Sequence, residues 1–226
     1  MMSEPDFKYR FIPSPSQQLA VDNSDQASGP KDDQSETLTL LLLHGTGGNE
    51  DDLIQVGQMI SPSASLLSPR GKVLENGMPR FFKRLAEGVF DLEDLKFRTR
   101  ELADFVKEVS SIYSFDLSKT IAVGFSNGAN MAASLLFSHP GTLMGMILFR
   151  AMVPFIPNSP LDLSNKKVLL SAGLFDPIVS EHQTRSLFDI LEKNRANVTL
   201  KWQQSGHSLT ESDVLYAKEW LSENFH

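Results

Sequence analysis

The clearest pattern in the chain is an alternation of short apolar runs with longer stretches in which apolar residues recur at helical spacing. The apolar or β-rich runs lie at 37–43, 63–68, 119–125, 144–149, 167–173 and 197–203. Helical spacing is found at 50–60, 94–113, 127–138, 181–194 and 211–223. Near-continuous apolar strands are typical of a sheet that is covered on both faces. The alternation therefore predicts an α/β fold with a doubly wound, mostly parallel sheet flanked by helices.

The first part of the chain does not follow this pattern. Residues 7–12 (FKYRFI) predict a first edge strand, whereas residues 13–36 are rich in Ser, Gln, Asp and Pro and contain few large apolar residues. Such a composition predicts a surface loop or a disordered insert at 13–36. The chain has 226 residues and shows no repeat, so we expect residues 1–226 to form a single domain.

Composition and charge argue against several classes of function. The formal net charge of −7 disfavours binding to nucleic acid and adsorption to anionic membranes. The chain contains no cysteine, which excludes disulfides, zinc–thiolate sites and a cysteine nucleophile. The N-terminal residues show no apolar signal segment, and the longest aliphatic run, at 40–43, is too short to span a bilayer. We therefore expect a cytoplasmic protein with neither a nucleic-acid partner nor a stable membrane association.

The strongest motif is Gly124-Phe125-Ser126-Asn127-Gly128, which matches the G-x-S-x-G pattern of the nucleophile elbow. The chemistry of this motif requires a sharp turn that exposes a serine between a strand and a helix. Here the motif joins the apolar run TIAVGF to the helical segment NGANMAASLLF. The alternative interpretation is a glycine-rich turn that only permits close packing. The context favours Ser126 as the nucleophile of an α/β-hydrolase.

A serine nucleophile needs a histidine base and a carboxylate that orients it, in the chain order Ser, acid, His. His207 follows the run at 197–203, at the edge where open parallel sheets place their ligands. Asp176 follows the run at 167–173 at the same edge, so we expect it to be the acid. The alternatives are a solvent-facing loop residue for His207 and an Asp-Pro turn former for Asp176. The other downstream histidines are interpreted as a helix cap, a surface residue and the chain end: His139, His182 and His226.

Acyl transfer also requires backbone donors for the negative charge that develops on the carbonyl oxygen. One donor is expected to be the N–H of Asn127, and the other an N–H of the loop after an early strand. The glycine-rich loop His44-Gly45-Thr46-Gly47-Gly48 follows the run at 37–43, and we choose the N–H of Thr46. Phosphate binding by this loop is the alternative. The acidic run at 50–52 would repel phosphate, and it is predicted to form the first turn of a helix.

Together these motifs resemble the phospholipase/carboxylesterase family of α/β-hydrolases, which includes acyl-protein thioesterases and small bacterial carboxylesterases. The matching segments, in the family's order, are LLLHGTGGNEDDL, SPRGKVLENGMPRFF, GFSNGANMA, GLFDPIV and SGHSLT. The resemblance is strongest to the bacterial carboxylesterase branch, including members linked to hydroquinone stress. It implies an α/β-hydrolase fold, hydrolysis of an ester or thioester, and no cofactor or metal. It also implies a triad of Ser126, Asp176 and His207, with Thr46 and Asn127 as oxyanion donors.

The long segment between residues 68 and 94 holds the candidate substrate pocket. We expect Met78, Phe81 and Phe82 to line an acyl or aryl pocket near the nucleophile, with Leu74 and Phe90 as further members. Packing of a short helix against the core is an equal alternative for this segment.

The expected function is that of a serine carboxylesterase that hydrolyses small to medium soluble esters through an acyl-enzyme intermediate. The segment RAMVPFIPNSP, after the run at 144–149, is too short for a large lid, which disfavours interfacial lipase action. Thioesterase or lysophospholipase activity at the same site is a close alternative, and a non-catalytic binding scaffold or a peptidase is a more distant one. The expected partner is a small-molecule ester, and a homodimer is left open.

Overall fold

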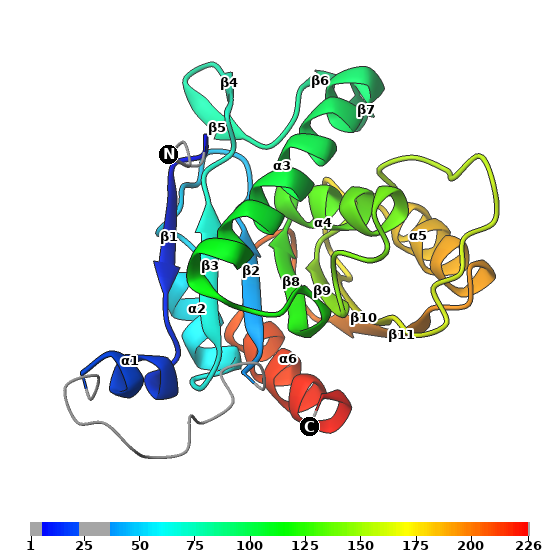
Figure 1. The fold of residues 1–226 in the computed structure, drawn as a ribbon. Helices are drawn as coiled ribbons and strands as arrows, with labels where there is room; N and C mark the ends of the chain where they lie inside the picture. The colour runs from blue at the N-terminus through cyan, green and yellow to red at the C-terminus, as the bar shows by residue number, and fades with distance from the viewer. Residues whose placement is uncertain (1–5, 23–36, 226) are drawn as a thin grey trace.

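The computed structural model describes residues 6–22 and 37–225, and its centre is a seven-stranded sheet (Figure 1). The strands of this sheet are β1 (Tyr9–Ile12), β2 (Thr39–Leu43), β3 (Ser65–Pro69), β8 (Thr120–Phe125), β9 (Gly145–Phe149), β10 (Lys167–Gly173) and β11 (Asn197–Gln203). Their order across the sheet is β1-β3-β2-β8-β9-β10-β11. β1 is antiparallel to β3, and the other neighbouring strands are parallel. The predicted mostly parallel sheet is therefore confirmed, with each strand close to its expected position.

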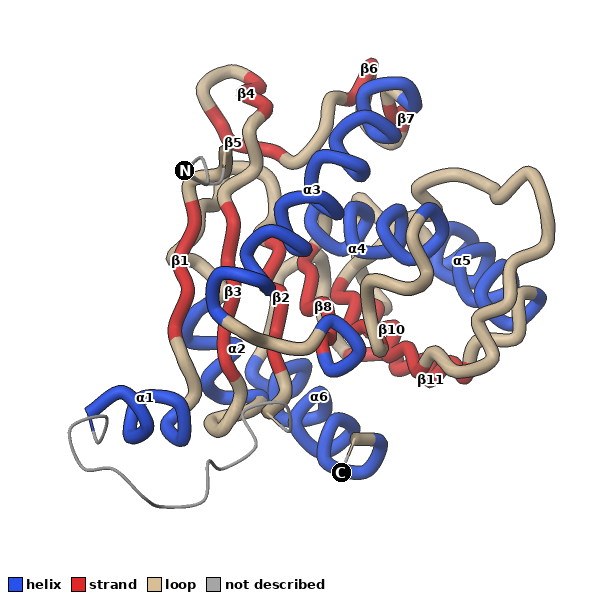
Figure 2. Tube along the Cα trace, viewed as in Figure 1, coloured by secondary structure: helices blue, strands red, loops and turns tan. Residues whose placement is uncertain are grey.

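Helices cover both faces of the sheet (Figure 2). The α-helices of the described residues are α1 (Pro15–Asp22), α2 (Ile54–Ile60), α3 (Leu92–Tyr113), α4 (Asn127–Ser138), α5 (Glu181–Lys193) and α6 (Glu211–Asn224), of which α1 lies beyond the end of β1. A core beneath α3, α4 and α5 fills one face, and a second core beneath α2 and α6 fills the other. Successive leucines of β2 belong alternately to these two cores, which explains why the strand is a continuous apolar run. Within the described residues, no helix is long and apolar enough to cross a membrane.

The beginning of α2 differs from the prediction. The helix starts at Ile54, so the acidic run at 50–52 lies in the preceding turn and does not form the first turn of the helix. Glu50 is 3% exposed, and its carboxylate pairs with Arg70 and Lys8. These two ion pairs, rather than the dipole of the helix, account for the position of Glu50.

The structure also corrects part of the expectation for residues 13–36, because α1 occupies Pro15–Asp22. The Gln17 N–H donates to Ser14 Oγ (3.2 Å), and the Ser14 N–H donates to Gln17 Oε1 (3.3 Å). These reciprocal hydrogen bonds form a capping box, and Pro15 occupies the first helical position. The Ser-Pro-Ser-Gln sequence at 14–17 is thus a helix-start signal within a stretch of loop-like composition. Residues 23–36 lie outside the described part of the chain.

The segment between β3 and α3 forms two hairpins and not a helix. β4 (Val73–Glu75) pairs with β5 (Met78–Arg80), and β6 (Arg84–Ala86) pairs with β7 (Val89–Phe90). Both hairpins project beyond the carboxyl ends of the parallel strands, at the top of Figure 1. They therefore stand above the edge of the sheet where the predicted site residues lie.

Candidate active site

Ser126 lies in the tight turn between β8 and α4. Its φ of 52° and ψ of −114° place it at positive φ, a region that residues with a side chain rarely adopt. Two backbone hydrogen bonds hold this conformation. The Ser126 N–H donates to the Phe149 carbonyl (2.9 Å), and the Ser126 carbonyl accepts from the Asn130 N–H (3.0 Å). The strained turn is thus supported on one side by β9 and on the other by the first turn of α4.

The two glycines of the motif are required by close packing around this turn. A Cβ atom at Gly124 would lie 2.6 Å from the Ala129 Cα atom, and one at Gly128 would lie 2.0 Å from the Leu43 carbonyl oxygen. Both distances are far below normal carbon contacts. The glycines therefore do permit close packing, as the alternative interpretation states. The same turn also presents Ser126 to a cavity.

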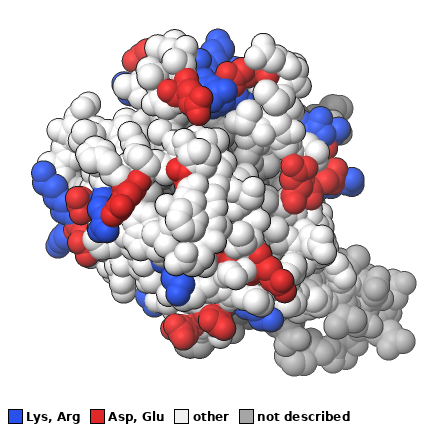
Figure 3. Space-filling view, turned by 180° about the vertical axis from the view of Figure 1, so that it is seen from behind, with Lys and Arg blue, Asp and Glu red and all other residues white. Residues whose placement is uncertain are grey.

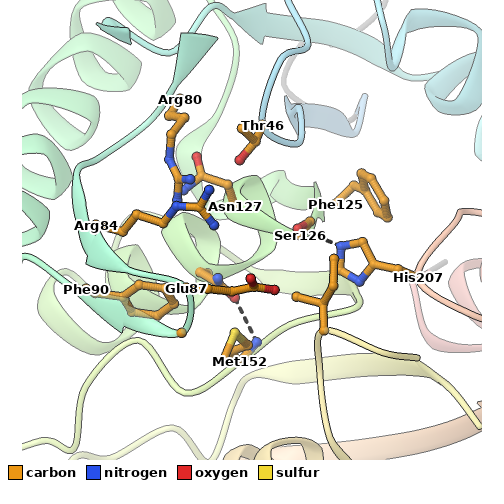
Figure 4. Close-up of a pocket in the computed structure, with 13 residues that line it drawn as sticks. Thr46, Arg80, Arg84, Glu87, Phe90, Phe125, Ser126, Asn127, Met152 and His207 are labelled. Atoms are coloured by element: carbon orange, nitrogen blue, oxygen red, sulfur yellow. Dashed lines mark hydrogen bonds between the residues drawn. The ribbon is translucent and has the colours of Figure 1, made fainter. Parts of the chain in front are cut away.

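The structure brings the three predicted site residues together at the carboxyl edge of the sheet. His207 Nε2 lies 2.9 Å from Ser126 Oγ (Figure 4). On the other side of the ring, His207 Nδ1 lies 2.9 Å from Asp176 Oδ2. The second oxygen, Asp176 Oδ1, accepts from the N–H groups of Ile178 (2.8 Å) and Val179 (2.9 Å). With Nδ1–H donating to Asp176, the free Nε2 atom can accept the proton of the Ser126 hydroxyl.

The other histidines lie apart from this arrangement. His139 follows α4, where its N–H donates to the Leu135 carbonyl, and burial lowers its pKa. His182 is an exposed residue of the first turn of α5. His226 lies outside the described residues. Neither His139 nor His182 has a hydrogen bond to Ser126 or lines its cavity.

The loop after β2 is fixed by a buried histidine whose role the sequence did not reveal. His44 Nδ1 lies 2.7 Å from the Gly45 carbonyl oxygen, to which it donates, and His44 Nε2 accepts from the Gly71 N–H at 2.9 Å. Accepting at Nε2 requires the neutral ring, and burial lowers the pKa of His44 accordingly. His44 thereby connects the predicted oxyanion loop to the segment after β3.

Thr46 and Asn127, the two predicted oxyanion donors, line the same cavity as Ser126 (Figure 4). No hydrogen bond within the described chain uses the backbone N–H of either residue. Asn127 is held in place by its side chain, because its Oδ1 atom accepts from the Phe81 N–H at 2.8 Å. The arrangement leaves two backbone donors available beside the serine.

A buried arginine holds the loop that carries His207. The guanidinium of Arg150 is fully buried and pairs with both oxygens of Asp213, at 2.9 and 2.7 Å. It also donates to the carbonyls of Gly206 (2.9 Å) and Ser208 (3.0 Å), the two neighbours of His207. Asp213 belongs to the capping box of α6. Although burial alone raises the pKa of Asp213, hydrogen bonds, first among them those from Arg150, lower it.

The cavity in front of Ser126 has a volume of about 290 Å³ and is lined by both apolar and charged side chains. Its apolar wall consists mainly of Phe90, Phe125, Met152 and Ile178. Of the residues expected to form the pocket, Phe90 is present. The exposed Leu74 is absent from the lining, as are Met78, Phe81 and Phe82.

The placement of Met78, Phe81 and Phe82 corrects the pocket prediction. Phe81 and Phe82 are buried in the core at 3% and 0% exposure. Phe81 packs against the His44 ring, and Phe82 packs edge-on against Phe90. Met78 is 42% exposed on β5. The alternative interpretation, that this segment packs against the core, is therefore correct for the two phenylalanines, although no helix forms.

A mostly parallel sheet with a serine elbow and a cavity at its carboxyl edge defines an α/β-hydrolase. The chain matches the family model described as phospholipase/carboxylesterase over residues 29–225. It is 50% identical over 184 residues to the putative hydrolase MhqD of Bacillus subtilis (strain 168). The aligned region covers 81% of this chain and 92% of that protein. The chain therefore belongs to the phospholipase/carboxylesterase family, as the sequence motifs indicate.

Solved structures agree with this assignment. The crystal structure of the Bacillus cereus carboxylesterase is similar with a TM-score of 0.88 and 44% identity, covering 98% of this chain and 96% of that chain. The structure of YahD with malic acid is similar with a TM-score of 0.84 and 33% identity, covering 96% of this chain and 99% of that chain. Family membership and these neighbours support an enzyme of the hydrolase class.

Replacing Arg150 by methionine should destabilise the protein strongly. The substitution leaves the buried Asp213 carboxylate without its cation, which typically costs about 3–5 kcal/mol, and removes the donors that hold the His207 loop. We expect a lower free energy of unfolding in a denaturant titration and slower labelling of Ser126 by a fluorophosphonate. Arg195→Met is the matched control, because Arg195 forms an exposed pair with Asp162. Equal stability of the two variants would contradict this role of Arg150.

Glu50 should stabilise the protein at neutral pH but not in acid. Burial alone raises the pKa of Glu50, but hydrogen bonds from Arg70 and Lys8 outweigh it and lower the pKa from 4.5 to about 2. The contribution to stability is thus present above pH 4.5 and is lost as the pH falls toward 2.

We expect Glu50→Gln to lower the free energy of unfolding at pH 7 by about 1–3 kcal/mol. The difference from the wild type should shrink as the pH falls below 4.5. Urea titrations at several pH values measure this difference. Asp51→Asn, which removes an exposed partner of Arg10, is the control and should change stability little. A difference that is constant with pH would refute the assignment.

Proposed function

We infer that this protein is a serine carboxylesterase that hydrolyses small to medium carboxylic esters through an acyl-enzyme intermediate. The observation that carries this proposal is the continuous hydrogen-bond chain from Ser126 through His207 to Asp176, at 2.9 Å for each link. The strained turn at Ser126 and the two free backbone donors beside it support the same conclusion. Family membership supplies the hydrolase class but not the identity of these residues.

In the proposed reaction, His207 Nε2 takes the hydroxyl proton as Ser126 Oγ attacks the ester carbonyl carbon. The carbonyl oxygen becomes an oxyanion, which the N–H groups of Thr46 and Asn127 stabilise. His207 then donates its proton to the departing alkoxide, and the carbon–oxygen bond breaks to leave an acyl-Ser126. Water repeats the sequence with His207 as base, releasing the acid and the free serine. Asp176 orients His207 and stabilises its protonated form.

Thioesterase or lysophospholipase activity uses the same chemistry, so the cavity decides between them. A volume of about 290 Å³ suits a small or medium acyl or alcohol group better than a long chain. The segment at 150–160 adds no helix or strand over the cavity. A comparison of p-nitrophenyl esters with acyl-CoA thioesters of increasing chain length measures the preference. The presence of all three triad residues argues against a non-catalytic scaffold.

The remaining expectations about partners are part of the same proposal. The partner is a small-molecule ester, in a cytoplasmic protein without nucleic-acid or stable membrane binding. On the face shown in Figure 3, basic and acidic side chains are interspersed and form no continuous basic surface. This distribution supports the expectation that no nucleic acid binds there.

Ser126→Ala should leave a folded protein that has lost nearly all esterase activity. Removal of the nucleophile in a comparable serine hydrolase lowers kcat by about 10⁶-fold. Activity on a p-nitrophenyl ester and the circular dichroism spectrum should be measured together. Ser138→Ala is a suitable control, because Ser138 is an exposed serine at the end of the same helix. A Ser126→Ala variant that kept a tenth of the wild-type kcat would disprove the assignment.

Asp176→Asn should fold normally but lower kcat by about 10²- to 10⁴-fold, because the amide presents a donor where His207 Nδ1–H needs an acceptor. The exposed Asp162→Asn is the control for loss of a loop carboxylate. Asp213 cannot take the place of Asp176, because both of its oxygens accept hydrogen bonds from Arg150 and from the hydroxyls of Ser171 and Thr210. If Asp176→Asn and Asp176→Ala both retained more than about half of the wild-type kcat, Asp176 would be only a turn former.

A further inference from the structure

The wall of the active-site cavity opposite His207 consists of hydrogen-bond donors. Arg80 and Arg84, from the two hairpins, and Asn127, at the start of α4, line this side (Figure 4). Apolar side chains line much of the remaining cavity. A ligand in contact with both Ser126 and this wall would therefore need an apolar body and a hydrogen-bond acceptor at one end.

The two arginines are held in place from behind by a single carboxylate. Arg80 Nη1 donates to Glu75 Oε2 (2.5 Å), and Arg84 Nε donates to Glu75 Oε1 (2.8 Å). The hydrogen bond from Arg84 lowers the pKa of Glu75. Burial raises this pKa, but the hydrogen bond from Arg80 lowers it further. Glu75 thus balances one of the two positive charges, and both of its oxygens are occupied.

Several donors of these side chains remain without an acceptor. No hydrogen bond or ion pair in the described part of the chain uses the Nη atoms of Arg84. The Arg84 side chain is 31% exposed and lines the cavity. A guanidinium fixed through Nε and free at both Nη atoms is oriented to bind a planar oxyanion.

Asn127 adds a buried donor beside the arginines. Its residue is 3% exposed, its Oδ1 atom is occupied by the Phe81 N–H, and its Nδ2 atom has no hydrogen-bond partner among the described residues. A buried amide N–H without an acceptor is unfavourable. The atom has almost no exposed surface, so this donor contributes to the polarity of the wall rather than to direct contact with a ligand.

Glu87 is the one acidic residue of the described chain that lines the cavity. It lies in the exposed turn between β6 and β7 and forms no ion pair with Arg84. Because Glu87 is exposed to solvent, its repulsion of an anion is screened more strongly than the attraction by the buried Arg80 and the partly buried Arg84. At the top of Figure 3, where the hairpins lie, acidic and basic atoms alternate in agreement with this mixed charge.

We propose that the preferred substrates are esters that carry a carboxylate at the end remote from the scissile bond, bound by Arg84 with Arg80 beside it. This inference rests on the proposed esterase function. A carboxylate offers two coplanar acceptor oxygens to the free nitrogen atoms of Arg84, and its charge is neutralised by the second guanidinium. The apolar wall formed by Phe90 and Met152 would contact the carbon chain between the two ends.

Two pairs of substrates of nearly equal shape test the proposal. The first pair is mono-p-nitrophenyl adipate and the corresponding adipamate, which place the carboxylate or its amide on the acyl side. The second pair is the O-acetyl derivative of p-hydroxyphenylacetic acid and that of its amide, which place the same groups on the alcohol side. We expect kcat/KM, corrected for spontaneous hydrolysis, to favour the carboxylate by about 10-fold or more in at least one pair.

Variants then identify the residues that cause the preference. Arg84→Gln should lower the carboxylate-to-amide ratio by about 10-fold, chiefly through KM, since the charge-assisted bonds act on binding. Lys83→Gln, which removes the same charge from the exposed neighbouring position, should leave the ratio unchanged. Glu87→Gln should raise the ratio, because it removes the repulsion. Using a ratio for each variant cancels any general loss of active enzyme.

The outcomes separate this inference from the proposed function. If the amides are hydrolysed and neither pair shows a preference, the carboxylate site is refuted while the esterase proposal stands. A ratio that falls equally in Arg84→Gln and Lys83→Gln, or a preference for amides that Glu87→Gln abolishes, would also refute it. If no ester of either pair is hydrolysed but the carboxylates still bind, as detected by competition with fluorophosphonate labelling of Ser126, the esterase function fails and the site stands.

Discussion

The buried ion pair between Arg150 and Asp213 is the interaction on which the geometry of the site depends. It connects the end of β9 to the start of α6, and the His207 loop lies between them. A fully buried charge is tolerated only where each polar atom finds a partner. Here the guanidinium satisfies the carbonyls of Gly206 and Ser208 as well as Asp213. The loop cannot move away without leaving those groups unpaired in the interior, so His207 is held at a fixed distance from the sheet.

The end of β9 supports Ser126 as well as the His207 loop. The Phe149 carbonyl accepts from the Ser126 N–H, and the next residue, Arg150, has a positive φ of 56°. At that residue the chain turns out of the sheet, while the Arg150 N–H still bonds to the Ser171 carbonyl of β10. Two adjacent residues at the end of one strand therefore position Ser126 and His207, which lie 81 residues apart in the chain. This common support explains how a strained serine and a loop histidine can keep a distance of 2.9 Å.

The sequence predicted the parts of the structure that depend on local pattern or on chain order. β2 is recognisable because both of its faces are buried, and Ser126 because the glycines around it are required by sterics. Arg150 was missed because its partner Asp213 lies 63 residues away, and its only local signal is a charge at the end of a wholly apolar strand. The pocket was predicted poorly for a different reason. Irregular hairpins have no periodicity from which to predict which of several phenylalanines faces the core. In this segment Phe90 lines the cavity, whereas Phe81 and Phe82 are buried in the core.

A net charge of −7 does not conflict with the proposed selection of an anionic substrate, because the net charge and the substrate contacts act over different distances. At physiological ionic strength, exposed charges separated by more than about 8 Å are largely screened, so the overall charge acts mainly on the rate of encounter. Inside the cavity the relevant charges are the two guanidiniums, the Glu75 carboxylate whose oxygens they occupy, and the exposed Glu87. The nitrogen atoms left free by Glu75 can only donate, so they accommodate a carboxylate better than an amide, whose NH₂ group would face them. Discrimination between the carboxylate and the amide therefore arises at contact, from the number of acceptor atoms that each group offers. The distant surface charge affects binding of either substrate far less than the donors of Arg84 do.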